Sequence, residues 1–326
     1  MAGLTGREIV GLERVSYGVE DMAKALRFFD DFGLKRLSSD GTTTLYEALN
    51  GTKVVVKPAN ANDLPEAVQP GSTVREIVWG VEKKEDLDKF AKELAKDRTV
   101  TRDKDGTVHA KDPMGLAIAF TKTRRRDISK KVFREQMNSP TQIERVDRAS
   151  ILRGHAVPAS LGHAVYYVPD LAAMEAFYVG RLKFGISDRY YKDGKLRGIF
   201  MRCSTPGDHH NWFLMQAPNG QAQLNHIAFK VRDIHEVFAG GLDLTRKGWA
   251  TEIGPGRHPI SSAYFWYLKN PAGGAIEYYT DDDHLTKKWK PRKFDSVPEN
   301  FAEWALPSGI QTHVVDIKER ETGKDA

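Results

Sequence analysis

The chain repeats one pattern of strands and a helix, and this internal repeat limits the folds that are open to it. Residues 12–22 (LERVSYGVEDM) match residues 161–171 (LGHAVYYVPDL). In both segments the alternating pattern of side chains predicts a strand, which is followed by the start of a helix. A second pair of matching segments begins at Val74 and Leu224, and a third pair closes each half with a Pro-x-Gly turn before a final strand. Apolar residues recur three and four positions apart in the helices. Each half therefore contains two copies of one unit.

A small sheet with one helix cannot bury both of its faces alone. Pairing two units curls their strands into an incomplete barrel, with the helices outside and a cavity within. Residues at alternate strand positions then point into the cavity. We therefore expect an α+β fold of two domains, each made of two paired βαβββ modules that form an incomplete barrel around a cavity.

Changes in composition predict four segments. These are a first domain at 8–122, a connector at 123–157, a second domain at 158–282 and a tail at 283–326. The connector is polar and basic, and we expect a short helix around residues 130–137. The tail carries several large apolar residues, so we expect it to pack on the second domain. Its end, from Lys318 onward, is expected to be disordered.

Composition indicates a soluble intracellular protein. Apolar residues make up 40% and charged residues 29% of the 326 residues, and no run of about 18 apolar residues predicts a membrane span. The single cysteine, Cys203, cannot form an internal disulfide, which fits a cytoplasmic location. Part of the net charge of +5 lies between Lys122 and Arg134. No recognition motif accompanies this basic run, so we expect neither nucleic acid nor a membrane as a partner.

The internal repeat also serves as a control for the histidines. Three cavity positions of the second half carry His163, His226 and Glu277, and the matching positions of the first half carry Arg14, Glu76 and Ala119. Any one of these histidines alone would be read as a core residue. Two histidines and one glutamate on three strands of only one copy favour a metal site in the second domain instead. Two imidazoles and a carboxylate form the facial triad of non-haem Fe(II) oxygenases, although imidazole also suits Mn(II) and Zn(II).

Four segments of the second half carry a more specific pattern: LGHAVYYV, DHHNWFLM, LNHIAFKV and GPGRHPISSAYFWYLKNPAGGAIEYYTD. They resemble the type I extradiol ring-cleaving dioxygenases of the vicinal oxygen chelate superfamily, such as the 2,3-dihydroxybiphenyl and catechol 2,3-dioxygenases. The resemblance covers nearly the whole chain and is strongest from Leu161 to Asp281. It implies that His163, His226 and Glu277 bind the metal, with Fe(II) expected and Mn(II) possible. The first domain resembles the family's inactive N-terminal domain.

The resemblance also implies three catalytic residues: His210 as the acid–base group, and His258 and Tyr267 beside the substrate oxygens. A histidine that titrates near neutral pH can both remove and return a proton. Two alternatives stay open from the residues themselves. The neighbouring His209 could be the working member of the pair, and Tyr267 could be a core aromatic residue.

The expected activity is extradiol cleavage, in which both atoms of O₂ enter a catechol-type aromatic diol as the ring opens beside the diol. One alternative is a metal-dependent lyase or isomerase of the glyoxalase kind, and another is a non-catalytic protein that binds aromatic ligands. The expected partners are a catechol-type diol, O₂ and further copies of the chain in a homo-oligomer. The sequence leaves the particular catechol open.

Overall fold

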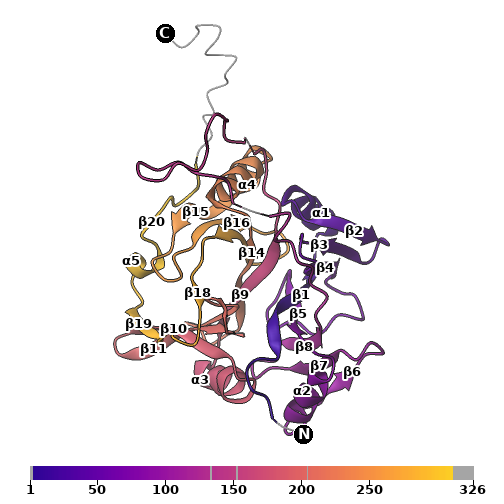
Figure 1. The fold of residues 1–326 in the computed structure, drawn as a ribbon. Coiled ribbons are helices and arrows are strands. Elements are labelled where there is room, and N and C mark those ends of the chain that lie inside the picture. The colour runs from indigo at the N-terminus through magenta and orange to yellow at the C-terminus, as the bar shows by residue number, and fades with distance from the viewer. Residues whose placement is uncertain (1–2, 133, 152, 204, 311–326) are drawn as a thin grey trace.

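The computed structural model describes residues 3–132, 134–151, 153–203 and 205–310, and within them the chain forms two large sheets flanked by helices (Figure 1). The elements of the first half are β1 (Ile9–Val19), α1 (Met22–Asp31), β2 (Lys35–Ser39), β3 (Thr44–Glu47), β4 (Lys53–Pro58), β5 (Thr73–Val81), α2 (Asp86–Leu94), β6 (Thr101–Arg102), β7 (Val108–Lys111) and β8 (Ala117–Lys122). The elements from Ser160 to Thr280 are β9 (Ser160–Val168), α3 (Leu171–Glu175), the π-helical segment η1 (Ala176–Arg181), β10 (Gly185–Lys192), β11 (Lys195–Arg202), β12 (Gly207–Asp208), β13 (Trp212–Gln216), β14 (Gln223–Lys230), α4 (Ile234–Arg246), β15 (Thr251–Arg257), β16 (Tyr264–Lys269) and β17 (Ala275–Thr280).

The strand order reflects the repeated unit. The first sheet has the order β2-β3-β4-β1-β5-β8-β7-β6, with β1 and β5 antiparallel at its centre. Each of these two strands pairs in parallel with the last strand of its own unit, β4 or β8. In the second sheet, β9 and β14 take the central places, with β13 and β17 as their parallel partners. The expected α+β fold of paired βαβββ modules is therefore confirmed.

The tail adds strands to both edges of the second sheet. β19 (Arg292–Asp295) pairs with β10 at one edge, and β20 (Trp304–Ala305) pairs with β15 at the other. Between them lies α5 (Pro298–Phe301), while β18 (His284–Leu285) pairs with β12 in a separate small sheet. The described part of the tail, residues 283–310, thus packs on the second half. The segment from Lys318, predicted to be disordered, lies outside the described residues.

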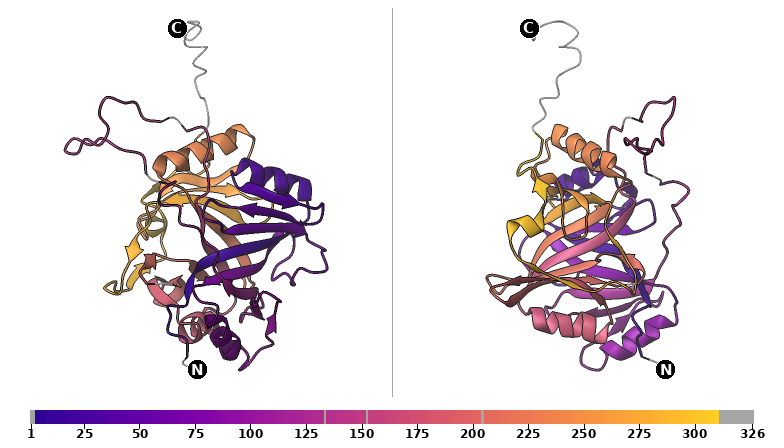
Figure 2. Two further views of the ribbon diagram at one scale, coloured as in Figure 1. Left: turned by 45° about the vertical axis from the view of Figure 1, so that its right-hand side comes forward. Right: turned by 60° about the vertical axis from the view of Figure 1, so that its left-hand side comes forward.

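The two halves share one hydrophobic core. On β9, Ala164, Tyr166 and Val168 join a cluster that also contains residues of α1, β1 and β5. Helices α1 and α4 lie side by side at one end of the molecule, and α2 and α3 at the other (Figures 1 and 2). Phe32 stacks on Tyr278, with ring centroids 4.2 Å apart. Because one face of β9 is used for this shared core, the alternate residues on its other face are left to line a cavity.

The connector differs from its prediction. Residues 123–132 and 134–151 contain no helix, so the short helix expected around residues 130–137 is wrong. The Asp127 carboxylate accepts a hydrogen bond from the Ser129 backbone N–H, and such local turns compete with helix formation. Several residues of the basic run make internal contacts; for example, Arg125 donates to the Val10 and Leu12 carbonyls, and Arg126 pairs with Glu47. Among the described residues, no helix is both long and apolar enough to cross a membrane.

Candidate metal centre and its cavity

Three neighbouring strands at the centre of the second sheet carry the predicted metal ligands. His163 lies on β9, His226 on β14 and Glu277 on β17. Ala228 pairs with His163 on one side and with Glu277 on the other. Its small side chain leaves room for the larger side chains to meet above the sheet. The sequence repeat therefore brings the three residues together through ordinary strand pairing.

The potential ligand atoms of these residues converge. His163 Nε2 lies 3.0 Å from Glu277 Oε2 and 3.1 Å from His226 Nε2, and His226 Nε2 lies 3.3 Å from Glu277 Oε2. All three side chains are buried. Glu277 Oε2 has no hydrogen-bond partner despite the two imidazole nitrogens near it. A buried carboxylate oxygen without a hydrogen bond is costly, and a cation held among these three atoms would satisfy it.

The protonation states also suit a metal. Burial lowers the pKa of His163 to about 4, so its imidazole is neutral at neutral pH. Burial alone would raise the pKa of Glu277, but the close approach of the His163, His226 and His258 imidazoles holds this pKa well below its usual range. Asn225 Oδ1 lies 2.6 Å from His226 Nδ1 and accepts a hydrogen bond from it. The proton of His226 is therefore on Nδ1, and Nε2 is free to act as a ligand. Neutral imidazole and carboxylate are the forms that bind metals.

The first half shows what the same framework does without a metal. At the positions that match His163 and His226, Arg14 Nη2 lies 3.1 Å from Glu76 Oε2. His109, which matches Tyr267 in the repeat, places Nδ1 2.8 Å from Glu76 Oε1. Here an arginine supplies the positive charge in place of an ion. Ala119 offers no ligand, so the metal triad exists in the second half only, within the described residues.

His210 and His209 lie in different places relative to the cavity. His210 lines the cavity, and its ring centroid lies 4.2 Å from that of His163. His209 is fully buried behind it, with Nε2 2.9 Å from Asp188 Oδ2 and Nδ1 3.1 Å from His210 Nδ1. Arg292 in the tail strand β19 donates to the same Asp188 carboxylate through its backbone and side chain. Burial and the neighbouring His163 keep the pKa of His210 well below its usual value.

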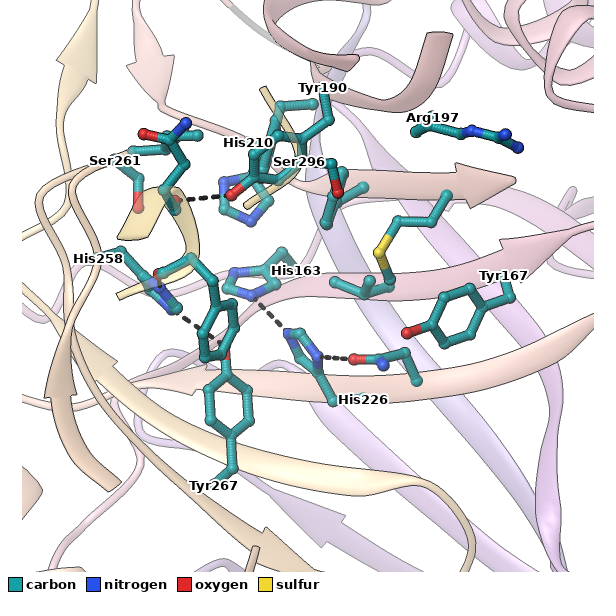
Figure 3. A pocket seen from close by; sticks show the side chains of 18 of the residues that line it. His163, Tyr167, Tyr190, Arg197, His210, His226, His258, Ser261, Tyr267 and Ser296 are labelled. Atoms are coloured by element: carbon teal, nitrogen blue, oxygen red, sulfur yellow. Dashed lines mark hydrogen bonds between the residues drawn. The ribbon is translucent and has the colours of Figure 1, made fainter. Parts of the chain in front are cut away.

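His258 and Tyr267 lie on the other side of the triad (Figure 3). His258 Nε2 lies 3.1 Å from the Tyr267 hydroxyl and 3.8 Å from Glu277 Oε1. Its Nδ1 lies 2.6 Å from the backbone carbonyl of Phe301 in the tail helix α5. A carbonyl can only accept, so His258 Nδ1 carries a proton and donates it to this bond. Burial raises the pKa of Tyr267 well above its usual value.

One cavity of about 960 Å³ contains all six predicted site residues. Phe213, Met215 and Tyr279 also line it, whereas Trp212 and Phe265 are fully buried in the protein interior. Sequence reasoning missed Asp188, Asn225 and the contributions of the tail. Asn225 directly precedes His226 in the sequence, so its contact with that histidine could have been predicted. Nothing in the sequence predicts that Asp188 or Phe301 contacts a histidine.

Comparison with known proteins relates the second half of the chain to one family. The model of the Glyoxalase/Bleomycin resistance protein/Dioxygenase superfamily matches residues 160–278, which include all six predicted site residues. Metapyrocatechase 2 of Cupriavidus necator is 28% identical over 174 residues, which are 51% of this chain and 52% of that protein. The 3-methylcatechol 2,3-dioxygenase of Pseudomonas putida is 29% identical over 143 residues, 42% of this chain and 47% of the relative. The chain thus spans about half the length of the curated relatives it matches.

Solved structures show the same fold over nearly the whole chain. Homoprotocatechuate 2,3-dioxygenase from Arthrobacter globiformis superposes with a TM-score of 0.71 at 21% identity, covering 93% of this chain and 90% of that one. The Mn(II)-bound glyoxalase from Novosphingobium aromaticivorans superposes with a TM-score of 0.70 at 20% identity, covering 91% of each chain. Residues 160–278 therefore match the Glyoxalase/Bleomycin resistance protein/Dioxygenase superfamily in sequence, and nearly the whole chain has the fold of these solved structures.

Proposed function

We propose that the protein is an extradiol dioxygenase that opens the ring of a catechol-type diol beside its two hydroxyl groups. The observation that carries the proposal is the combination of a two-histidine, one-carboxylate triad with His210, His258 and Tyr267 in one cavity. In this reaction both atoms of O₂ enter the product. No external reductant is needed, because the aromatic diol supplies the electrons.

The triad would be formed by His163, His226 and Glu277, with Fe(II) or Mn(II) as the ion. Such an ion, when bound, would offer open positions to the diol and to O₂ and would carry electron density between them. The protein's own groups handle the protons. His210 is the acid–base group in this proposal, because its Nδ1 is committed to His209 and its Nε2 remains for the substrate.

On the opposite side, His258 and Tyr267 bind and orient the diol oxygens. Because His258 Nδ1 donates a hydrogen bond to the Phe301 carbonyl, its Nε2 can accept one from the Tyr267 hydroxyl. This arrangement fixes the direction of the tyrosine O–H and places two polar groups beside the carboxylate ligand. Groups held this way favour one orientation of the bound diol and stabilise its ionised form.

The second candidate is a metal-dependent lyase or isomerase, and the likeness to a Mn(II)-bound glyoxalase structure is the observation in its favour. That likeness, at 20% identity, concerns the fold alone. Such chemistry generally needs a second acidic group beside the metal. In the described part of the chain, Glu277 is the only carboxylate of the triad. Of the other carboxylates that line the cavity, Asp282 is paired with Lys230 2.9 Å away, and Asp193 and Glu252 are exposed. The dioxygenase is therefore better supported.

The deciding experiment is anaerobic purification with metal analysis, followed by oxygen-electrode assays with a panel of catechols. We expect one mole of O₂ consumed per mole of catechol, together with a yellow ring-fission product. A protein that holds its metal, consumes no O₂ with any catechol and isomerises a hemithioacetal of a 2-oxoaldehyde would contradict the proposal and support the second candidate.

A further inference from the structure

Arg197 enters the cavity because of an irregularity in strand pairing. In the hairpin of β10 and β11, Tyr190 pairs with Gly198 and Tyr191 pairs with Leu196. Arg197 is therefore the extra residue of a β-bulge. A bulge redirects a side chain that regular alternation would send to the other face of the sheet. Arg197 consequently lines the same cavity as His163 and His210 (Figure 3).

Arg197 also lacks the partner that nearby arginines have. Arg189 on β10 pairs with Glu175, and Arg202 on β11 donates to the Ile186 carbonyl and the Ser187 hydroxyl. No described carboxylate pairs with Arg197, and its Nε is buried without a hydrogen bond. An unsatisfied buried guanidinium nitrogen costs free energy. A ligand in the cavity that accepts a hydrogen bond from it would remove this cost.

The position of Arg197 defines which part of a ligand it can touch. β11, β13 and β9 are neighbours, with Gly198 paired to Met215 and Met215 paired to Tyr167. Tyr167 lies four residues beyond His163 on β9, which corresponds to roughly 13 Å along a strand. Arg197 and Tyr167 therefore lie at the end of the cavity away from His258, as Figure 3 also shows. A group bound there belongs to a substituent of the ring and not to the diol.

The cavity has room for such a substituent. Its volume of about 960 Å³ is near the upper end of the range of roughly 300–1,000 Å³ usual for small-molecule sites. The planar guanidinium matches a carboxylate through two parallel hydrogen bonds. Asp193 and Glu252 are exposed at the cavity wall and offset the charges of Arg197 and Lys192, which favours a singly charged carboxylate over a doubly charged phosphate.

We propose that Arg197 binds a carboxylate on a side chain of the ring substrate, so that the protein acts on carboxylated catechols. The proposal rests on the proposed dioxygenase function and narrows its substrate class. In the bound state, the Arg197 guanidinium pairs with the carboxylate, and the Tyr167 hydroxyl can add a hydrogen bond. The diol at the other end of the same molecule lies among the triad, His210 and His258.

The test compares matched substrates that differ only in charge. The probes are 3-(2,3-dihydroxyphenyl)propanoate and 3-(3,4-dihydroxyphenyl)propanoate, each with its neutral primary amide, and the readout is the ratio of kcat/KM for acid over amide. For the better isomer we expect the wild-type ratio to be about 10 to 100, the usual worth of a charge-assisted hydrogen-bonded pair. Arg197→Gln should bring the ratio to within about threefold of one, and Arg197→Lys should give a value between the two.

The control is Lys195→Gln, which removes an exposed positive charge from the same hairpin but not from the cavity. It should keep the wild-type ratio. A wild-type ratio near one for both isomers, or an Arg197→Gln ratio equal to that of the wild type, would overturn the proposal while leaving the dioxygenase function intact. If no catechol is cleaved, the proposed function fails. Calorimetric binding of each acid and amide to the Mn(II)-loaded protein without O₂ then tests the subsite separately, with equal affinities counting against it.

Discussion

The Asp188 carboxylate lies 2.9 Å from His209 Nε2, and this contact determines where the proton of His210 is placed. Because a carboxylate accepts, His209 carries its proton on Nε2 and has an acceptor at Nδ1. His210 Nδ1, 3.1 Å away, must then donate, which leaves His210 Nε2 unprotonated. The buried chain Asp188–His209–His210 thus leaves His210 Nε2 able to accept a proton on the cavity side, as the proposed acid–base role requires.

The first prediction tests this chain. Asp188→Asn should lower kcat roughly 10- to 100-fold, because the amide can turn its NH₂ to His209 and reverse the tautomers. The metal content should stay near that of the wild type, and the pH profile of kcat should shift. Glu175→Gln, which removes the ion-pair partner of Arg189 on the same strand, is the matched control and should change neither. An unchanged pH profile in Asp188→Asn would mean that this carboxylate has only a structural role.

The second prediction concerns metal binding. His163→Ala, His226→Ala and Glu277→Ala should each abolish turnover and sharply reduce bound Fe(II) or Mn(II), since each removes one ligand of three. Inductively coupled plasma mass spectrometry should find about one metal ion per wild-type chain. Circular dichroism should show that the fold persists, because these residues line the cavity and lie outside the shared core.

The repeat supplies the control for these variants. Glu76→Gln alters the position in the first half that matches His226, where the glutamate pairs with Arg14 and His109. It should leave metal content and turnover unchanged. Two metal ions per chain, or metal loss in Glu76→Gln, would contradict the assignment of the site to the second half alone.

The third prediction separates proton transfer from metal binding. His210→Gln should keep the metal and still bind catechol without O₂, but lose turnover by roughly 10²- to 10⁴-fold, the usual worth of a positioned acid–base group. Tyr267→Phe should lose less, because His258 remains beside the substrate. Parallel measurements of O₂ uptake and ring-fission product would detect uncoupling in the His210 variant. Normal turnover in His210→Gln combined with loss in His209→Gln would reverse the assignment of the pair.

The fourth prediction is a pH dependence of stability. Asp112 is buried, and burial raises its pKa to about 7 although it accepts hydrogen bonds from Tyr178 and from the backbone N–H groups of Met114 and Leu116. The folded state therefore binds this proton more tightly than the unfolded state. Stability from this group is present at low pH and is lost as the pH rises through about 7.

Asp112→Asn should remove that dependence. The free energy of unfolding of the variant minus that of the wild type should be larger at pH 8 than at pH 5, by on the order of a few kcal/mol. The matching residue of the second half is already an asparagine, Asn270, which accepts from the Ala272 backbone in the same turn. Urea unfolding at both pH values measures the difference. A variant whose difference from the wild type is equal at pH 5 and pH 8 would show that Asp112 is ionised in the folded protein throughout.

The sequence was sufficient for the parts of the site that follow from strand periodicity. His163, His226 and Glu277 occupy equivalent positions of a repeated unit, and strand pairing alone brings such positions together. Asp188 and Arg292 could not be found this way, because they meet through the pairing of the tail strand β19 with β10, which no repeat predicts. Arg197 was missed for a related reason. A bulge breaks the period of two on which strand predictions rest, and it reverses the face that the residue occupies.

The tail has a consequence for the newborn chain. The first sheet is complete once Lys122 has left the ribosome. The contact of Asp188 with Arg292 and that of His258 with the Phe301 carbonyl form only after the tail has been synthesised. At ~5–20 residues per second, translation of the intervening chain takes roughly ten seconds or more. During that time Asp188 lacks its Arg292 partner, and His258 lacks the carbonyl that accepts the hydrogen bond from its Nδ1. A nascent chain stalled before residue 290 would therefore carry His163, His226 and Glu277 together with the Asp188–His209–His210 chain, but without the tail contacts to Asp188 and His258.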